Sequence, residues 1–137
     1  MDPIAPILTL AEGGSSEYVI VRSAAASEAE IRAAGEFQKY FCQITGASLP
    51  VVTDETPAAG PEIVVGRTNR EAAGEFDRAE LGGDGYIVKT DGGKLWLVGG
   101  GDLGTEYAVY GFLEDHLGCR FYTPDFERVP HRPDVSL

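Results

Sequence analysis

The sequence is poor in basic residues. Its 137 residues include 11 Lys and Arg against 22 Asp and Glu, which gives a formal net charge of −11. Nucleic-acid-binding proteins use a surplus of Lys and Arg to displace counterions from phosphates, and no basic run occurs here. The same deficit disfavours an anionic membrane surface. We therefore expect neither nucleic acid nor membrane as a partner. The charge is compatible with neutral ligands such as sugars, and it also serves to keep a domain soluble.

The sequence also lacks a long apolar run. No segment reaches the length that spans a bilayer as a helix. Residues 1–10 contain no basic region and are interrupted by Pro3 and Pro6, so they do not form an intact secretory signal. The compartment is left open, because a cytosolic protein and one whose signal has been removed both fit.

Cysteine and histidine are scarce, with only Cys42, Cys119, His116 and His131 present. The two cysteines lie in or just after apolar helical segments, which is typical of small buried side chains. Whether they pair is left open, because the sequence does not give the geometry. No spacing matches a metal site, and no Ser or Cys nucleophile neighbours either histidine. We expect no metal, no cofactor and no nucleophilic catalytic site.

Acidic residues are abundant in the second half of the chain, and a pair of carboxylates can hydrolyse a glycoside. The candidates are Asp84, Asp91, Asp102, Glu106, Glu114, Asp115, Asp125 and Glu127. None lies in an apolar segment that would raise its pKa, and so many acids bring some pair together in almost any fold. We assign no acidic residue a catalytic role.

Aromatic residues could stack on sugar rings. The candidates are Trp96, Tyr107, Tyr110, Phe121 and Tyr122. Trp96 alternates with Leu95 and Leu97 in a predicted strand, so it faces the opposite side of the sheet. A position in the core or at a domain interface is favoured for Trp96, because large aromatic side chains are usually buried.

Two segments have the periodicity of amphipathic helices. The first begins with a capping box of Ser27 and Glu30 and ends at Gly46, a typical helix-terminating residue. Its apolar positions are Ile31, Ala34, Phe37, Phe41 and Ile44. Gly35, which disfavours helix, is expected to mark a close approach to the sheet. The second helix is predicted over residues 105–117, and its apolar positions are Ala108, Val109, Phe112, Leu113 and Leu117.

Strands are predicted between and around these helices. Their ranges are 6–11, 18–22, 49–53, 62–65, 86–90 and 94–98, and glycines join the last two as a hairpin. We also predict a short surface helix within residues 69–81, an extended segment at 120–122 and an edge strand within 129–137. This order predicts an α+β domain, with a mixed β-sheet covered on one face by both long helices.

A glycine motif lies between the hairpin and the second helix. Gly99, Gly101 and Gly104 match the G-x-G-x-x-G pattern of dinucleotide-binding turns, and helix N-termini attract phosphate. However, the strand before the motif belongs to a hairpin, and no second parallel strand with an acidic residue follows at the required spacing. The pattern is interpreted as a glycine turn, and a nucleotide-binding enzyme is kept as an alternative.

Several segments together resemble a known family. They are AAGEFQKYF (33–41), ITG (44–46), LPVV (49–52), IVVGRT (63–68), DGYIV (84–88), GTEYAVYGFLE (104–114) and LGCRFYTP (117–124). In order and spacing they resemble the N-terminal domain of α-glucuronidase-like glycoside hydrolases. They are also similar to the small domain that precedes the barrel in β-N-acetylhexosaminidases.

The resemblance implies a zincin-like fold without zinc, in which a mixed sheet carries two long helices on one face. It also implies that residues 1–137 form a single non-catalytic accessory domain of a larger chain. Such a domain packs against a downstream (β/α)8 barrel of the same chain, and the barrel supplies the catalytic carboxylates. No catalytic, cofactor-binding or metal-binding residue is carried over to this sequence.

Two details complete these expectations. Leu103 stands where relatives have a basic residue, so any polar contact of that residue is absent here. Arg120, Phe121 and Tyr122 are expected to contact the barrel, because they are largely aromatic and follow the last helix directly. An autonomous carbohydrate-binding module remains the alternative function. Sugar specificity and oligomeric state are left open.

Overall fold

The structure is a computed structural model that describes residues 9–91, 93–123 and 126–136. For residues 120–123 and 126–128 it describes the backbone alone. Part of the strand predicted at 6–11, and Gly92 of the predicted hairpin turn, lie outside the described residues.

A five-stranded sheet forms the centre of the fold, with strand order β3-β2-β4-β6-β5. The strands are β2 (Val19–Arg22), β3 (Val51–Thr53), β4 (Glu62–Val65), β5 (Tyr86–Asp91) and β6 (Lys94–Gly99). The first four in the spatial order run parallel, and β5 pairs antiparallel with β6. The predicted α+β class and mixed sheet are confirmed. The predicted hairpin is confirmed too, and β6 also continues the parallel part of the sheet.

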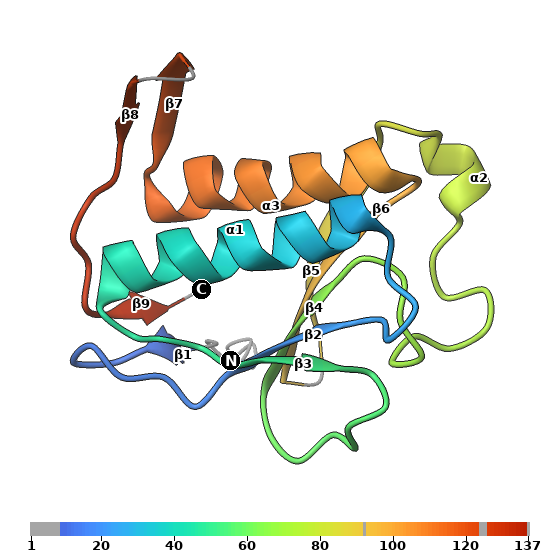
Figure 1. The fold of residues 1–137 in the computed structure, drawn as a ribbon, viewed down its shortest axis with the longest axis horizontal. Coiled ribbons are helices and arrows are strands. Elements are labelled where there is room, and N and C mark those ends of the chain that lie inside the picture. Colours follow the sequence, from blue (N-terminus) through green and yellow to red (C-terminus); the bar gives the residue numbers. More distant parts are fainter. Residues whose placement is uncertain (1–8, 92, 124–125, 137) are drawn as a thin grey trace, which may run out of the picture.

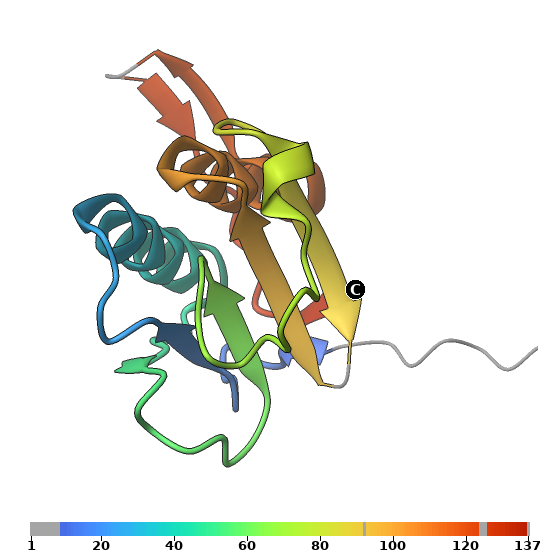
Figure 2. The ribbon, with the colours of Figure 1, turned by 90° about the vertical axis from the view of Figure 1, so that its right-hand side faces the viewer.

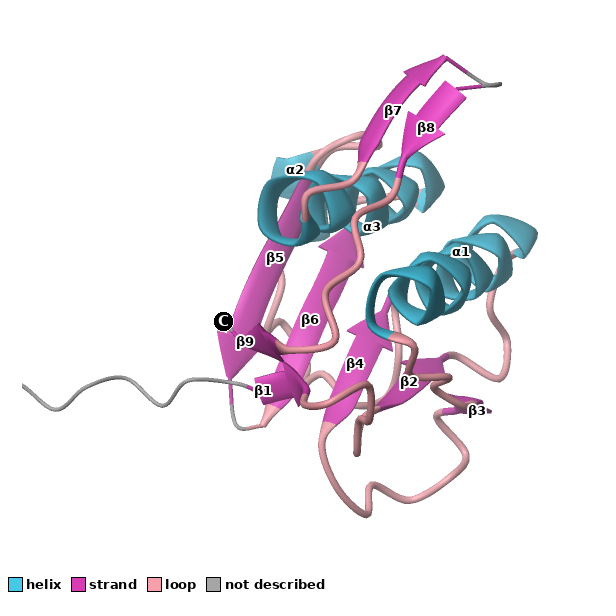
Figure 3. Ribbon diagram, turned by 90° about the vertical axis from the view of Figure 1, so that its left-hand side faces the viewer, coloured by secondary structure: helices cyan, strands magenta, loops and turns pink. Residues whose placement is uncertain are grey.

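Two small antiparallel pairs complete the strands. β1 (Thr9–Ala11) pairs with β9 (Val135–Ser136), so the strand predicted in the tail joins β1 and not the central sheet. β7 (Arg120–Thr123) pairs with β8 (Phe126–Arg128). This hairpin projects from the C-terminal end of the second long helix (Figures 1 and 3).

The two long helices are α1 (Glu28–Thr45) and α3 (Asp102–Leu117), and they lie side by side on one face of the sheet (Figures 1 and 2). The predicted capping box is present: Ser27 Oγ accepts from Glu30 N at 3.2 Å, and Ser27 N donates to Glu30 Oε1 at 3.0 Å. Gly46 ends α1 with a φ of 83°, a conformation that glycine adopts without strain.

The main core lies between these helices and the sheet. Phe37 is fully buried, and its ring centroid lies 5.5 Å from Phe41 and 5.9 Å from Phe112. Ile63 and Leu97 contribute to this core from β4 and β6. Burial of one such side chain stabilises a fold by about 1.5–3 kcal/mol. The predicted apolar side of the second helix is confirmed, because all five of its residues are buried.

Three details of the helices differ from the prediction. Ile31 is 45% exposed, because α3 packs on the other flank of α1, where Arg32 Nε donates to Glu106 Oε1 at 2.9 Å. Gly35 faces solvent, and a Cβ there would meet nothing within 4 Å, so the expected approach to the sheet is wrong. α2 (Arg78–Leu81) is only the last part of the predicted short helix.

Candidate functional site

The glycine motif is the first candidate, and we call residues 99–104 the glycine junction. Its backbone packs directly on the loop at residues 82–85. Gly100 N donates to Gly85 O at 2.9 Å, and Gly104 N donates to Gly83 O at 3.0 Å. A Cβ on Gly100 would lie 1.8 Å from Gly82 O. Glycine is therefore required here so that two stretches of backbone can approach each other.

This packing bears on phosphate binding. A phosphate-cradling turn needs free backbone N–H groups directed at the ligand. Two amides of the glycine junction, at Gly100 and Gly104, already donate to backbone carbonyls. The carbonyl oxygens of Gly82, Gly83 and Gly85 lie against the junction and repel anionic oxygens. The geometry is that of a turn packed against a second turn.

A small hollow of about 210 Å³ lies beside the junction, at the carboxyl ends of β4 and β6. This is the position at which open α/β sheets bind ligands. Its lining comes from both helix N-termini and from the loop after β4. The lining residues are Glu30, Arg67, Arg78, Gly99, Gly100, Gly101, Asp102 and Thr105.

The charged side chains around this hollow hold the structure together. Glu30 completes the capping box of α1 and also accepts from Arg67 N at 2.8 Å. Asp102 Oδ1 accepts from Ser27 Oγ at 2.9 Å, which links the N-termini of the two long helices. Arg78 Nη2 donates to Glu71 Oε2 at 2.7 Å. These carboxylates also complement the positive ends of the helix dipoles.

The second face of the sheet is covered by the loop between β4 and β5, which we call the covering loop (residues 66–85). Trp96 is 4% exposed, and the ring of Phe76 lies on it with centroids 5.4 Å apart. Val64 and Val98 complete this smaller cluster. The buried position predicted for Trp96 is confirmed. Its Nε1 is buried without a hydrogen-bond partner in the part of the chain that the structure describes.

An ion pair anchors the start of the covering loop. Glu62 is 1% exposed at the start of β4, and Arg70 Nε lies 3.0 Å from its Oε1. Arg70 Nη1 also donates to the carbonyl of Asp54 at 3.2 Å. Sequence reasoning missed this pair, because Glu62 was assigned only to an apolar strand. An acid at the start of an otherwise apolar strand was the available signal.

Asp54 is a second anchor. Its carboxylate accepts from Ala24 N and from Asn69 N, each at 3.0 Å, and so joins the loops that follow β2 and β4. Burial acts to raise the pKa of Asp54, but these hydrogen bonds and the charge of Arg70 outweigh it and hold the pKa below its usual value. Asp54 therefore serves as a structural carboxylate.

The remaining titratable candidates include the two histidines and the two cysteines, whereas Asp125 lies outside the described residues and Glu127 is described by its backbone alone. His116 is exposed, with its ring 5.1 Å from Phe112, and His131 is exposed in the tail. Cys42 is half-buried and Cys119 is buried, and the two do not form a disulfide with each other. No group of three or more His, Cys, Asp or Glu side chains able to hold a metal occurs among the described residues.

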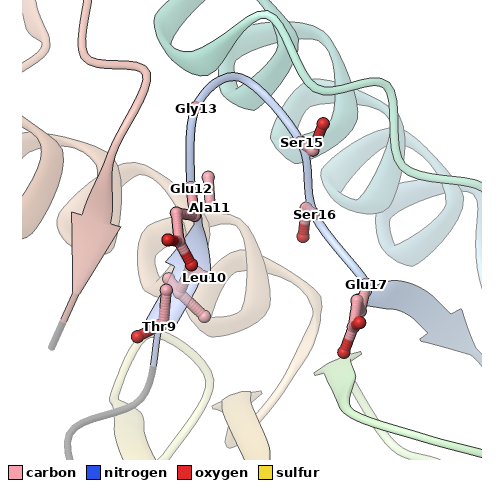
Figure 4. Close-up of a pocket in the computed structure, with 8 residues that line it drawn as sticks. All are labelled: Thr9, Leu10, Ala11, Glu12, Gly13, Ser15, Ser16 and Glu17. Carbon is pink, nitrogen blue, oxygen red and sulfur yellow. The ribbon is translucent and has the colours of Figure 1, made fainter.

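A larger open hollow of about 590 Å³ lies beside β1 (Figure 4). The chain turns at Gly13, and Thr9 to Glu12 face Ser15 to Glu17 across it. Hydroxyls and carboxylates of this kind can bind neutral hydroxyl groups. Among the described side chains, the rings of Trp96, Tyr107 and Tyr110 do not line it.

The aromatic candidates for sugar stacking differ in their exposure. Tyr107 is 45% exposed on α3, and Tyr110 is half-buried. The side chains of Arg120, Phe121 and Tyr122 lie outside the described part of the structure, which gives only the backbone of β7 there. The contact predicted for these three residues stays a prediction.

The chain matches no protein-family model, and no curated protein matches it. Among the described residues, none of the helices has the length and apolar character needed to cross a membrane.

Proposed function

We propose that the chain is a non-catalytic accessory domain of a glycoside hydrolase, which packs against a catalytic (β/α)8 barrel. The proposal begins from the family resemblance of its segments in order and spacing. It includes the finer assignment of the fold as zincin-like without zinc, similar to the small domain of β-N-acetylhexosaminidases.

One observation carries the proposal: the segments that resemble the family serve the packing of this structure. The segment IVVGRT supplies the buried strand β4, and GTEYAVYGFLE supplies the buried side of α3. The glycine junction packs backbone against backbone, and Gly46 and Gly118 end the two long helices with φ of 83° and 81°. Segments used in this way support a scaffold that holds two helices on one sheet.

A glycosidase assay tests the non-catalytic part of the proposal. The purified chain is incubated with nitrophenyl glycosides, including the β-N-acetylglucosaminide and the α-glucuronide. We expect release of nitrophenol at the rate of the buffer alone. Turnover that follows the purified chain through two different columns, and that is lost on heating through its unfolding transition, would refute the proposal.

The position of the domain has a separate test, which is to read the coding sequence beyond Leu137. The proposal predicts a following segment with the alternating strands and helices of a (β/α)8 barrel. A stop codon at that point, or a following domain of another class, would contradict it.

A further inference from the structure

The covering loop contains a segment that is fixed at both ends and held weakly between them. At one end, the side chain of Arg70 is paired with buried Glu62. At the other end, the carbonyl of Gly83 accepts a hydrogen bond from the glycine junction. Residues 71–81 lie between these two anchors, and all of them are described, with Phe76 as the one buried residue. We call residues 71–81 the lid.

The hydrogen bonds of the lid are internal. Arg78 Nη2 donates to Glu71 Oε2 at 2.7 Å, and Ala72 N donates to Glu75 Oε1 at 2.8 Å. Among the residues that the structure describes, no hydrogen bond joins the lid to any part of the chain outside residues 71–82. The lid therefore has contacts that maintain its own shape, but no hydrogen bond to the sheet that it covers.

One aromatic contact holds the lid on the sheet. The ring of Phe76 lies on Trp96, in the small cluster that Val64 and Val98 complete. A hollow of about 460 Å³ lies beside Phe76, lined by the lid together with Arg67 and Thr68 of the loop after β4. Segments with few buried apolar contacts open at a lower free energy than the main core of a protein. The lid has this character.

Trp96 gives a second reason for opening. Its Nε1 is buried, and no group in the described part of the chain accepts its proton. A buried donor without a partner is unfavourable, and water hydrates the donor once the lid moves away. The closed state therefore carries a cost that the open state does not.

We propose that the lid opens as one piece and uncovers Trp96, while the sheet, both long helices and the glycine junction stay folded. The inference goes beyond the proposed function and does not depend on it. One hinge follows Arg70. The other is Gly82, whose φ of 72° glycine adopts without strain and whose backbone can change conformation readily. The open state presents an indole ring with a free N–H on the second face of the sheet.

Hydrogen exchange of the whole chain, followed by NMR, tests the proposal. Trp96 is the only tryptophan, so its indole N–H gives a single signal of its kind. The comparison is with the amides of Gly66 and Gly100, which donate to Leu97 O and Gly85 O outside the lid. We expect a protection factor about tenfold lower, or less, for the indole proton. Low concentrations of urea should accelerate exchange of the two amides but not of the indole, because local opening exposes little surface.

Two variants separate opening of the lid from global unfolding. Val109→Ala changes a buried residue of the main core and should accelerate exchange at Gly100 about tenfold. It should leave exchange of the Trp96 indole unchanged, because Val109 stays packed when the lid opens. Phe76→Leu weakens the contact that holds the lid and should accelerate exchange of the indole about tenfold. Ala73→Ser, at an exposed position within the lid, is the matched control and should alter neither rate.

Three results would overturn the proposal. An indole proton with the protection factor of Gly100, or one that Val109→Ala accelerates as much as Gly100, would mean that only global unfolding exposes Trp96. Indole exchange that is unchanged in Phe76→Leu would mean that water reaches Trp96 without movement of the lid. The glycosidase assay is independent of all three results, so the accessory role stands or falls separately.

Discussion

The two faces of the central sheet are stabilised in different ways. One face is covered by α1 and α3 (Figure 2), and its packing is mainly apolar, with Phe37 among the fully buried side chains. The other face is covered by irregular chain, in which Phe76 is the main apolar contact and ion pairs fix the path. Regular helices bury a continuous apolar stripe, whereas a loop with few apolar residues depends on specific polar contacts.

The difference has an energetic consequence. The free energy gained from apolar burial falls roughly in proportion to the apolar area that a substitution removes. A buried ion pair contributes little net stability, but removal of one partner leaves an uncompensated charge. The helix face should therefore respond to changes of volume and the loop face to changes of charge.

The largest expected effect is on the helix face. Phe37→Ala removes a fully buried ring in contact with Phe41 and Phe112, and should lower the free energy of unfolding by about 3–5 kcal/mol. Phe76→Ala on the loop face should cost less, because its cluster is smaller. Urea unfolding followed by circular dichroism measures both, with Ile31→Ala as the exposed control. Equal losses of unfolding free energy for Phe37→Ala and Phe76→Ala would contradict the larger apolar contribution of the helix face.

The next effect is on the loop face. Glu62→Gln leaves Arg70 without its carboxylate at side-chain exposures of 10% and 2%, and should cost about 3 kcal/mol. Lys94→Gln is the control, because Lys94 Nζ lies 3.8 Å from Glu62 and is more exposed, so its loss should cost less than about 1 kcal/mol. The double variant with Glu62→Leu and Arg70→Met should recover much of the loss. A double variant as unstable as Glu62→Gln would argue against an uncompensated charge.

A third effect tests the glycine junction, which joins the two faces. Gly100→Ala places a Cβ 1.8 Å from a backbone carbonyl and should destabilise by about 1–3 kcal/mol. Gly35→Ala places a Cβ in open space within α1 and should stabilise by about 0.5–1 kcal/mol. Thermal melts of the two variants should shift in opposite directions. An unchanged melting temperature for Gly100→Ala would mean that the close approach of the two loops does not stabilise the fold.

The smallest effect is that of Asp54, whose pKa is lowered in the folded chain. A lowered pKa means that its contribution is present above the unfolded value of about 3.9 and is lost as pH falls through the folded value. Asp54→Asn should cost about 1 kcal/mol at neutral pH. An amide has one acceptor oxygen and keeps only one of the two backbone hydrogen bonds, and solvent screens the lost charge. Urea midpoints of wild type and variant should converge below about pH 4. A gap that stays constant with pH would exclude the carboxylate as the cause.

The sequence predicted the helix face better than the loop face. The capping box, the helix ends at Gly46 and Gly118, and the hairpin follow from local spacing, because each depends on neighbours a few residues apart. The exposure of Ile31 could not be predicted from local spacing, because the whole fold determines on which flank of α1 the helix α3 packs. The pairing of the tail strand with β1 is likewise a contact between distant segments.

The candidate site was less predictable. The glycine motif was visible, but its packing against Gly82 to Gly85 depends on a loop whose path no periodicity specifies. Arg70 lies eight positions after Glu62 and beyond the end of β4, so spacing did not identify it as the partner of the acid that begins this apolar strand.

The packing role of the glycine junction can be tested directly, because a phosphate-binding turn would respond to nucleotides. Amide NMR spectra of the chain are recorded during titration with NAD and with ATP, and the signals of residues 99–104 are followed. We expect no saturable shift at these amides, since Gly100 and Gly104 already donate to Gly85 and Gly83. Saturable shifts there with a Kd at or below about 1 mM would identify a phosphate-binding turn and contradict the scaffold assignment.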